Sequence, residues 1–202
     1  MAMVQAKVKI LGTRDLLLHK FGPEALPLEK QEKEGVAGHN PNEWKKTVLA
    51  TRDGQLYIEP TYIFACIRDG ARNIKKGARG TLAKDTAATL QVADDRVLLD
   101  RWMPEGRDIA PPLDPDEPVY LHVSGVRIGT ARHVRYRVAA GKGWRTEFTI
   151  IWDNTIVSRD QMKSAIIDAG RLCGLADGRQ IGFGRFVVEE MEIEDYAKTQ
   201  TA

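Results

Sequence analysis

No stretch of the 202-residue sequence is apolar over the roughly 18 residues that a membrane-spanning helix needs. The first residues carry Lys7 and Lys9 inside an apolar stretch, which is typical of a strand and unlike a signal peptide. Cysteine is scarce: Cys66 and Cys173 lie far apart, without the CxxC motif or Cys/His cluster of a structural zinc site. We therefore expect a protein of the reducing cytoplasm that binds neither a membrane nor a metal.

Motifs for nucleotide-dependent and hydrolytic chemistry are also missing. The segment Gly141-Lys142-Gly143 lacks the upstream glycine and the following serine or threonine of a P-loop. The chain contains no G-x-S-x-G element, which would present a nucleophilic serine. We expect no cofactor and no enzymatic activity.

The net charge of +2 conceals an uneven distribution of charged residues. Residues 118–146 contain no aspartate or glutamate but six lysines and arginines, and residues 68–84 contain six cations against the single Asp69. The compensating acidic residues gather in 94–117 and 189–195. This segregation predicts a basic side for which a polyanion is the natural partner, although an ordinary solvated surface is the alternative.

Hydrophobic periodicity predicts an α+β fold. One helix is expected over 61–76, and a second begins at a Ser158 cap and ends at Gly174. The Gly141–Gly143 turn favours a hairpin between the last two internal strands. The order strand, helix, strands, helix, strand is that of a ferredoxin-like or RRM-type βαββαβ core with large loop and β-hairpin insertions. The strands are expected at 4–11, 55–59, 96–99, 119–126, 134–138, 144–152 and 183–193.

The chain is expected to form a single domain over residues 1–202, with two insertions and a tail. Residues 22–48 form a flexible loop that is rich in proline, glycine and mixed charge. Residues 81–118 form an irregular excursion interrupted by prolines, and residues 196–202 form a frayed tail.

A glycine-rich segment, residues 169–186 (AGRLCGLADGRQIGFGRF), joins the second helix to the last strand. Together with the first strand and the LLLH segment Leu16–His19, it resembles the repeat-associated mysterious protein (RAMP) superfamily, which builds CRISPR effector backbones and processes CRISPR RNA. Only Gly182 and Gly184 keep the G-x-G spacing of the processing enzymes. Phage and prophage proteins with this layout look like still closer relatives.

The resemblance implies a set of partners and a location. It implies that the chain binds single-stranded nucleic acid in the cytoplasm of a bacterial host cell. It also implies assembly with itself, as a homo-oligomer or filament, or with other effector subunits. Backbone subunits of the superfamily line up by feeding an extended loop over the neighbouring copy, a role that the two insertions could take here.

A single-strand binding surface needs cations without neighbouring acids for phosphates and exposed aromatic side chains for bases. Trp44 has polar neighbours and is the stacking candidate. The predicted nucleic-acid-binding residues are Lys20, Trp44, Lys45, Lys46, Arg72, Lys75, Lys76, Arg79, Arg132, His133, Arg135, Arg137, Lys142, Arg145, Arg179, Gly182, Gly184 and Arg185.

The glycine-rich segment has a physical interpretation of its own. Gly178, Gly182 and Gly184 can adopt positive φ and expose backbone N–H groups beside Arg179 and Arg185, which would form a phosphate-binding surface. The alternative is a helix end and a bulged strand start that need no ligand.

Two residues near the N-terminus are the alternatives for catalysis. The resemblance implies a general acid-base histidine in the N-terminal part of processing nucleases, where His19 lies. It also implies target cleavage by a loop aspartate with a metal ion, as Asp15 could perform, but no partner acid is indicated.

Three hypotheses follow. The first is a sequence-independent binder of single-stranded DNA or RNA that assembles along the strand. The second is an RNA-processing endoribonuclease using His19. The third is an assembly protein whose basic surface meets an acidic partner, with the 189–195 strand of the next copy as the candidate.

Overall fold

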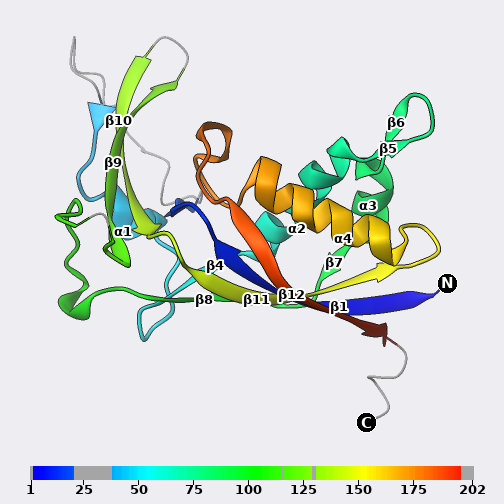
Figure 1. Ribbon diagram of the computed structural model, residues 1–202. Coiled ribbons are helices and arrows are strands. Elements are labelled where there is room, and N and C mark those ends of the chain that lie inside the picture. Colours follow the sequence, from blue (N-terminus) through cyan, green and yellow to red (C-terminus); the bar gives the residue numbers. More distant parts are fainter. Residues whose placement is uncertain (1, 21–37, 115, 129–130, 197–202) are drawn as a thin grey trace.

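The largest sheet of the protein has the strand order β12-β1-β11-β8-β4, with the short β7 also paired to β11 (Figure 1). The computed structural model describes residues 2–20, 38–114, 116–128 and 131–196. Every pairing in this sheet is antiparallel. Its strands are β1 (Met3–Gly12), β4 (Gln55–Ile58), β7 (Gln91–Val92), β8 (Val97–Trp102), β11 (Arg145–Asp153) and β12 (Phe186–Asp195).

Two helices connect these strands into a ferredoxin-like core. The chain passes from β1 through α2 (Pro60–Gly70) to β8, and from β11 through α4 (Arg159–Asp168) to β12. The last of these four strands lies beside the first, followed by the third and then the second, which is the order of an antiparallel βαββαβ sheet. The expected α+β class with a ferredoxin-like core is therefore confirmed.

Both helices cover the same face of the sheet, and the alternation of β1 separates that face from the uncovered one. Lys7 and Lys9 are exposed on the uncovered face. A Cβ on Gly70 would lie 2.3 Å from the carbonyl oxygen of Ala165, so a glycine lets α2 approach α4 closely. The buried side chains of β1 are Val4, Ala6, Val8 and Ile10.

The ends of α4 follow the predicted signals. Ser158 Oγ accepts a hydrogen bond from the Gln161 N–H at 3.3 Å, and Gln161 Oε1 accepts one from the Ser158 N–H at 3.0 Å, which is a capping box. The helix continues as one π-helical turn, Ala169–Cys173, and ends at Gly174 with φ of +83°. The predicted Ser158 cap and Gly174 end are confirmed.

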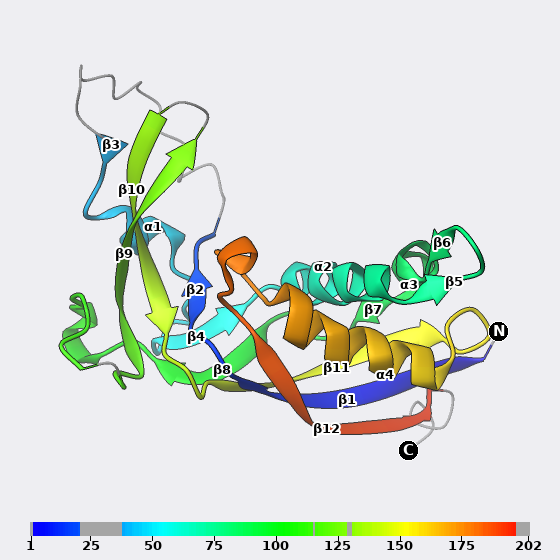
Figure 2. The same cartoon turned by 45° about the horizontal axis from the view of Figure 1, so that its top comes forward.

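A long hairpin of β9 (Val119–Ile128) and β10 (Ala131–Ala140) rises at one end of the main sheet (Figures 1 and 2). β10 also pairs antiparallel with β2 (Leu16–Leu18) and parallel with β3 (Gly38–His39), so it is the centre of a second sheet. The β5–β6 hairpin lies at the opposite end of the molecule.

The predicted hairpin between strands 134–138 and 144–152 is wrong. The first of these strands pairs with β9, and the second lies in the main sheet beside β1. The Gly141–Gly143 turn instead carries the chain from one sheet to the other. Its ends are held by distant carbonyls, since the Gly141 N–H donates to Pro118 O and the Gly143 N–H to Gly12 O, both at 2.9 Å.

The first predicted helix is shorter than expected. α2 ends at Gly70 and is followed by a 3-10 turn, Ala71–Asn73. Lys75–Lys76 (β5) and Gly80–Thr81 (β6) then form a small exposed hairpin rather than a last helical turn. Gly77 makes the reversal possible because it adopts φ of +65°.

The region 81–118 is less irregular than expected. It begins with α3 (Ala83–Thr89), whose Thr86 and Thr89 are buried, and continues through β7 and β8 of the main sheet. The prolines that suggested an irregular chain all follow these elements, at residues 104–118.

Parts of the other predicted mobile segments lie outside the described residues. This holds for residues 21–37 of the expected 22–48 loop and for 197–202 of the tail. The remainder of the loop contains β3 and the short helix α1 (Glu43–Thr47). Among the described helices, none is long and apolar enough to cross a membrane.

Candidate nucleic-acid interface

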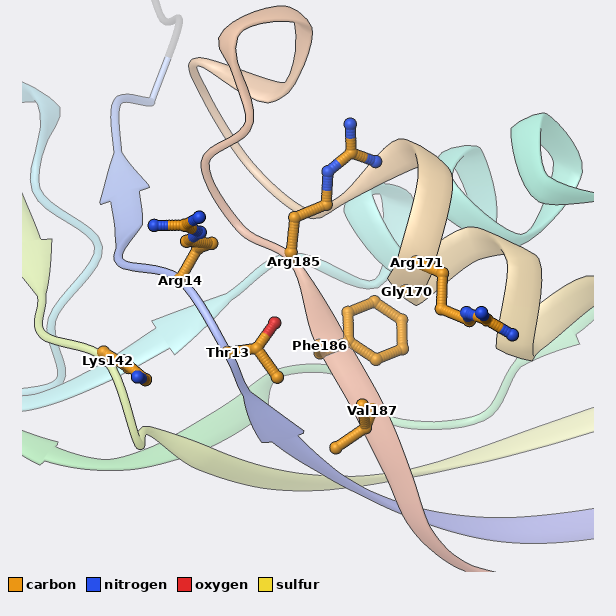
Figure 3. A pocket seen from close by; sticks show the side chains of 8 residues that line it. All are labelled: Thr13, Arg14, Lys142, Gly170, Arg171, Arg185, Phe186 and Val187. Atoms are coloured by element: carbon orange, nitrogen blue, oxygen red, sulfur yellow. The ribbon is translucent and has the colours of Figure 1, made fainter.

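A pocket of about 520 Å³ opens where β1 ends, α4 ends and β12 begins (Figure 3). Its lining contains four cations and no carboxylate. Figure 3 shows Arg185 at the start of β12, with Arg14 and Lys142 to one side of it and Arg171 to the other. We call the four residues Arg14, Lys142, Arg171 and Arg185 the cationic pocket.

Backbone hydrogen bonds hold Arg14 beside Arg185. The N–H groups of Thr13 and Arg14 both donate to Arg185 O, at 2.8 and 3.3 Å. The buried Trp144 donates from Nε1 to Arg14 O at 2.8 Å, which anchors the same turn to the core. The two arginines therefore extend from a rigid junction of β1 and β12.

Asp15 ties three segments together at this junction. Its Oδ1 accepts from the Lys142 N–H at 2.8 Å, its Oδ2 from the Tyr120 hydroxyl at 2.7 Å, and its carbonyl oxygen from the Gly184 N–H at 2.8 Å. Burial and the hydrogen bond to Asp15 raise the pKa of Tyr120, which keeps the phenol a donor. Both carboxylate oxygens are thus engaged in holding Lys142 and the glycine-rich segment in place.

The charges of the cationic pocket are not neutralised internally. None of its four residues forms an ion pair with a described residue. Glu189, four residues after Arg185 in the sequence, accepts instead from Arg145 Nε at 3.2 Å. Arg185 Nη1 is buried and has no hydrogen-bond partner among the described residues. Because no carboxylate among the lining residues balances these four charges, the pocket is electrostatically suited to an anion.

The three glycines of the predicted phosphate cradle do not present their N–H groups to a ligand. Gly178, Gly182 and Gly184 take φ of +72°, +96° and +68°, as the sequence suggested. Their N–H groups, however, donate within the protein, so the predicted backbone phosphate cradle is wrong. The acceptors are Asp177 Oδ1 (2.8 Å), Arg179 O (3.2 Å) and Asp15 O (2.8 Å), respectively.

The predicted basic face of the β9–β10 hairpin is largely neutralised. Arg135 Nη1 donates to Glu43 Oε1 at 2.7 Å, and both side chains are partly buried. His133 is half-buried, and the side chain of Arg132 lies outside the described residues. The hairpin therefore offers a phosphate less free charge than its sequence indicates.

Arg137 is buried, with an exposed fraction of 4%, and cannot contact a phosphate as predicted. Its Nε lies 3.0 Å from Asp177 Oδ2, an ion-pair contact without the alignment of a hydrogen bond. Burial lowers the pKa of Arg137, and the charge of Asp177 opposes this effect. The prediction is wrong because the glycine-rich segment covers this strand face at the base of the hairpin, where Phe183 contacts His122.

His19 faces the internal ion pair of Arg135 and Glu43. Its Nε2 lies 3.2 Å from Glu43 Oε1 and 3.0 Å from Arg135 Nη1. Burial opposes ionisation of Glu43, but hydrogen bonds from the Tyr136 N–H and His19, with the charge of Arg135, lower its pKa. His19 Nε2 is therefore engaged in a contact inside the protein, whereas a general base needs a ring nitrogen that faces the RNA.

The predicted stacking residue Trp44 is also wrong. It is 6% exposed and belongs to the core, because α1 turns this side chain inward while its polar neighbours stay in solvent. Lys45 Nζ lies 5.6 Å from the centroid of the Trp44 ring, and Lys46 is exposed. Lys20 Nζ lies 3.6 Å from a carboxylate oxygen of Glu59.

The second basic block divides into two groups. Arg72 and Arg179 lie against Asp69 on α2. Lys75, Lys76 and Arg79 are exposed around the β5–β6 hairpin, where Lys76 pairs with Asp85. Because that hairpin lies at the far end from β9–β10, the predicted residues do not form one continuous patch (Figures 1 and 2).

The sequence reasoning missed Arg14 and Arg171. Arg14 is an isolated cation in a Thr-Arg-Asp turn, and Arg171 lies in the last turn of the second helix, where a basic residue is ordinary. The structure brings them to the pocket from opposite ends of the chain. No local pattern marks either residue as part of a site.

Comparisons with known proteins give little further guidance. No protein-family model matches the sequence, and no curated protein matches it. Among solved structures, one similar chain comes from a cryo-EM structure of the Type III-B Cmr-beta bound to cognate target RNA, with a TM-score of 0.49 and 12% sequence identity. The match covers 96% of this chain but only 61% of the other one. The likeness is too distant to carry an argument about function.

Proposed function

We propose that this protein binds single-stranded nucleic acid, DNA or RNA, without sequence preference, through phosphate contacts in the cationic pocket. The observation that carries the proposal is a pocket lined by four cations and no carboxylate, in which none of the four forms an ion pair with a described residue. Phosphate contacts position a strand without reading its bases, so binding of this kind is independent of sequence.

We propose binding without catalysis. Asp15 and His19, the two catalytic alternatives, are both engaged in internal hydrogen bonds. Incubation of the protein with labelled hairpin RNA, with and without a chelator, tests this directly. Stable shifted complexes without cleavage products support a binder, and product formation would overturn the proposal in favour of the endoribonuclease.

We further propose that copies assemble along the strand, alone or with other effector subunits. The β9–β10 hairpin projects from one end of the fold, and the edge strand β12 carries several exposed acidic side chains that a basic surface of the next copy would fit. Electron microscopy of the protein with and without a long single strand tests the assembly. Particles that stay monomeric on the strand would contradict it.

The pocket is tested by the double substitution Lys142→Ala/Arg185→Ala. Each phosphate contact to a single strand adds about 0.7 to the slope of log K against log salt, so the loss of two contacts lowers the slope by about 1.4. At 0.1 M salt this corresponds to an affinity that is roughly 25-fold weaker. Fluorescence anisotropy with labelled oligothymidylate and oligouridylate, over a series of salt concentrations, measures both quantities.

The matched control for the pocket variant is Lys7→Ala/Lys9→Ala. It removes the same charge from the uncovered face of the sheet, where Lys7 and Lys9 pair with Glu147 and Glu190. The proposal expects near-normal binding from this control. Equal weakening of the two variants would show that only net charge matters and would remove the pocket from the site.

A further inference from the structure

Three arginines surround one carboxylate, one from α2, one from the 3-10 turn that follows it and one from the glycine-rich segment. Asp69 Oδ1 accepts from Arg68 at 3.0 Å and lies 3.4 Å from Arg72 Nη2, and its Oδ2 accepts from Arg179 at 3.3 Å. The Asp69 side chain is 16% exposed, whereas that of Arg72 is 63% exposed. The carboxylate therefore lies beneath guanidinium groups that face solvent. We call these four residues the arginine cluster.

The charge ratio distinguishes this cluster from the other ion pairs of the basic blocks. Arg135 meets Glu43, Arg137 meets Asp177 and Lys76 meets Asp85, one acid for each cation. In the arginine cluster one acid meets three cations, which leaves a formal charge of +2 on the surface. Asp69 thus orders the guanidinium groups without neutralising them, and their remaining N–H donors suit a phosphate.

The arginine cluster and the cationic pocket act on a common neighbour, Cys173. Burial raises the pKa of this thiol, Asp69 raises it further, and the charges of Arg185 and Arg179 lower it. Asp168 also acts on the thiol, so the surroundings contain two acids against the arginines of both groups. Cys173 also lies on the π-helical turn Ala169–Cys173 with Arg171 of the cationic pocket, and the glycine-rich segment continues from it to Arg179 of the arginine cluster.

We infer that a bound strand leaves the cationic pocket across the glycine-rich segment and that the arginine cluster holds a second phosphate of that strand. The inference rests on the proposed function and adds the path of the strand. This path runs toward α2 rather than up the β9–β10 hairpin, since Arg135 and Arg137 on the hairpin are paired one to one.

The first test substitutes the cluster and measures binding of oligothymidylate by anisotropy. Arg72→Ala/Arg179→Ala is expected to lower the salt slope by about 0.7, the loss of one phosphate contact, and to weaken binding roughly 5-fold at 0.1 M salt. The matched control is Lys7→Ala/Lys9→Ala, which also removes two cations, on the uncovered face of the sheet. Thermal unfolding checks that each variant is folded.

The outcomes separate this inference from the function on which it rests. Normal binding by the cluster variant, together with weak binding by Lys142→Ala/Arg185→Ala, overturns the second subsite and leaves the proposed function standing. Normal binding by both variants overturns the proposed function itself. Weakening by Lys7→Ala/Lys9→Ala as large as that by the cluster variant also overturns the subsite, because the effect is then one of net charge.

The second test uses the unmodified protein and its two cysteines. Cys173 is half-buried and Cys66 is 1% exposed, so a maleimide at mildly alkaline pH is expected to label Cys173 first. Saturation with oligothymidylate should slow this labelling several-fold if the strand crosses between the two groups. An unchanged labelling rate with a saturated pocket means that the strand takes another path, and the inference is then wrong.

Discussion

The buried ion pair of Arg137 and Asp177 offers a sharp prediction because its two members differ in exposure. The Arg137 side chain is 5% exposed, whereas that of Asp177 is 42% exposed. The perturbations are Asp177→Asn and Arg137→Met. The amide of the first variant keeps an oxygen for the Gly178 N–H but removes the charge that faces Arg137. The second variant replaces the guanidinium with an apolar side chain of similar length.

The expected loss of unfolding free energy for each variant depends on whether a buried, unpaired charge remains after the substitution. At 3.0 Å and an effective dielectric constant of about 20, the gross attraction of the pair is about 5 kcal/mol. Asp177→Asn loses this attraction while the guanidinium stays buried, so we expect a loss of about 3 kcal/mol in the free energy of unfolding. Arg137→Met removes the buried charge together with the attraction and leaves Asp177 in contact with water, so its cost should be about 1 kcal/mol or less.

Urea unfolding followed by tryptophan fluorescence measures both variants, since Trp144 and Trp152 are fully buried. The reasoning is refuted if Arg137→Met costs as much as Asp177→Asn or more. The same proteins test the site: Arg137→Met should keep the salt slope of oligothymidylate binding, because a buried side chain does not contact phosphate. A reduced salt slope for this variant would show that Arg137 does contact the strand.

Two further predictions concern the glycine-rich segment and the histidine beneath it. Gly184→Ala should lower the free energy of unfolding by more than 2 kcal/mol, because its Cβ would lie 2.0 Å from Leu175 O. Gly182→Ala meets no atom within 4 Å, so it should lose only about 1 kcal/mol for its positive φ. Equal thermal unfolding of the two variants would contradict the packing argument. Burial and the charge of Arg137 lower the pKa of His122 below 6.5, so the unfolded state binds this proton first as the pH falls. The free energy of unfolding should therefore decrease below pH 6.5, by at most about 1.4 kcal/mol per pH unit. Urea unfolding of His122→Gln should show a smaller decrease. If this variant has the same pH dependence as the unmodified protein, His122 is not the group responsible.

The core of the fold could be predicted from the sequence because its signals are local. The Ser158 cap, the Gly174 helix end and the alternation of the first strand all act within a few residues, and each element formed where expected. The pairing of strands was predicted less well. The Gly141–Gly143 turn has the sequence of a hairpin, but its N–H groups bind carbonyls that are distant in the chain, and this tertiary contact overrides the local preference.

The site could be predicted only in part for the same physical reason. Lys142 was predicted from a basic block and Arg185 from the glycine-rich segment, and both line the pocket, but no local sequence pattern marks Arg14 or Arg171. The prediction that Trp44 stacks on bases was wrong because polar neighbours in a short helix do not show which face of the helix packs on the core. A pattern of charges therefore locates basic segments without showing how they meet.

Whether a cation is available to a ligand depends on the acid that the fold places beside it. Arg135 is neutralised by Glu43 and Arg137 by Asp177, although no acid lies near either arginine in the sequence. Arg185, in contrast, has Glu189 close by in the sequence but forms no ion pair with a described residue, because that glutamate binds Arg145. Distance in sequence to the nearest acid therefore predicts wrongly which arginines are available to a ligand, both for the two hairpin arginines and for Arg185. If phosphate binding follows availability, substitutions in the cationic pocket and the arginine cluster should weaken binding more than equal charge removal from the hairpin, even though the hairpin belongs to the most basic block of the chain.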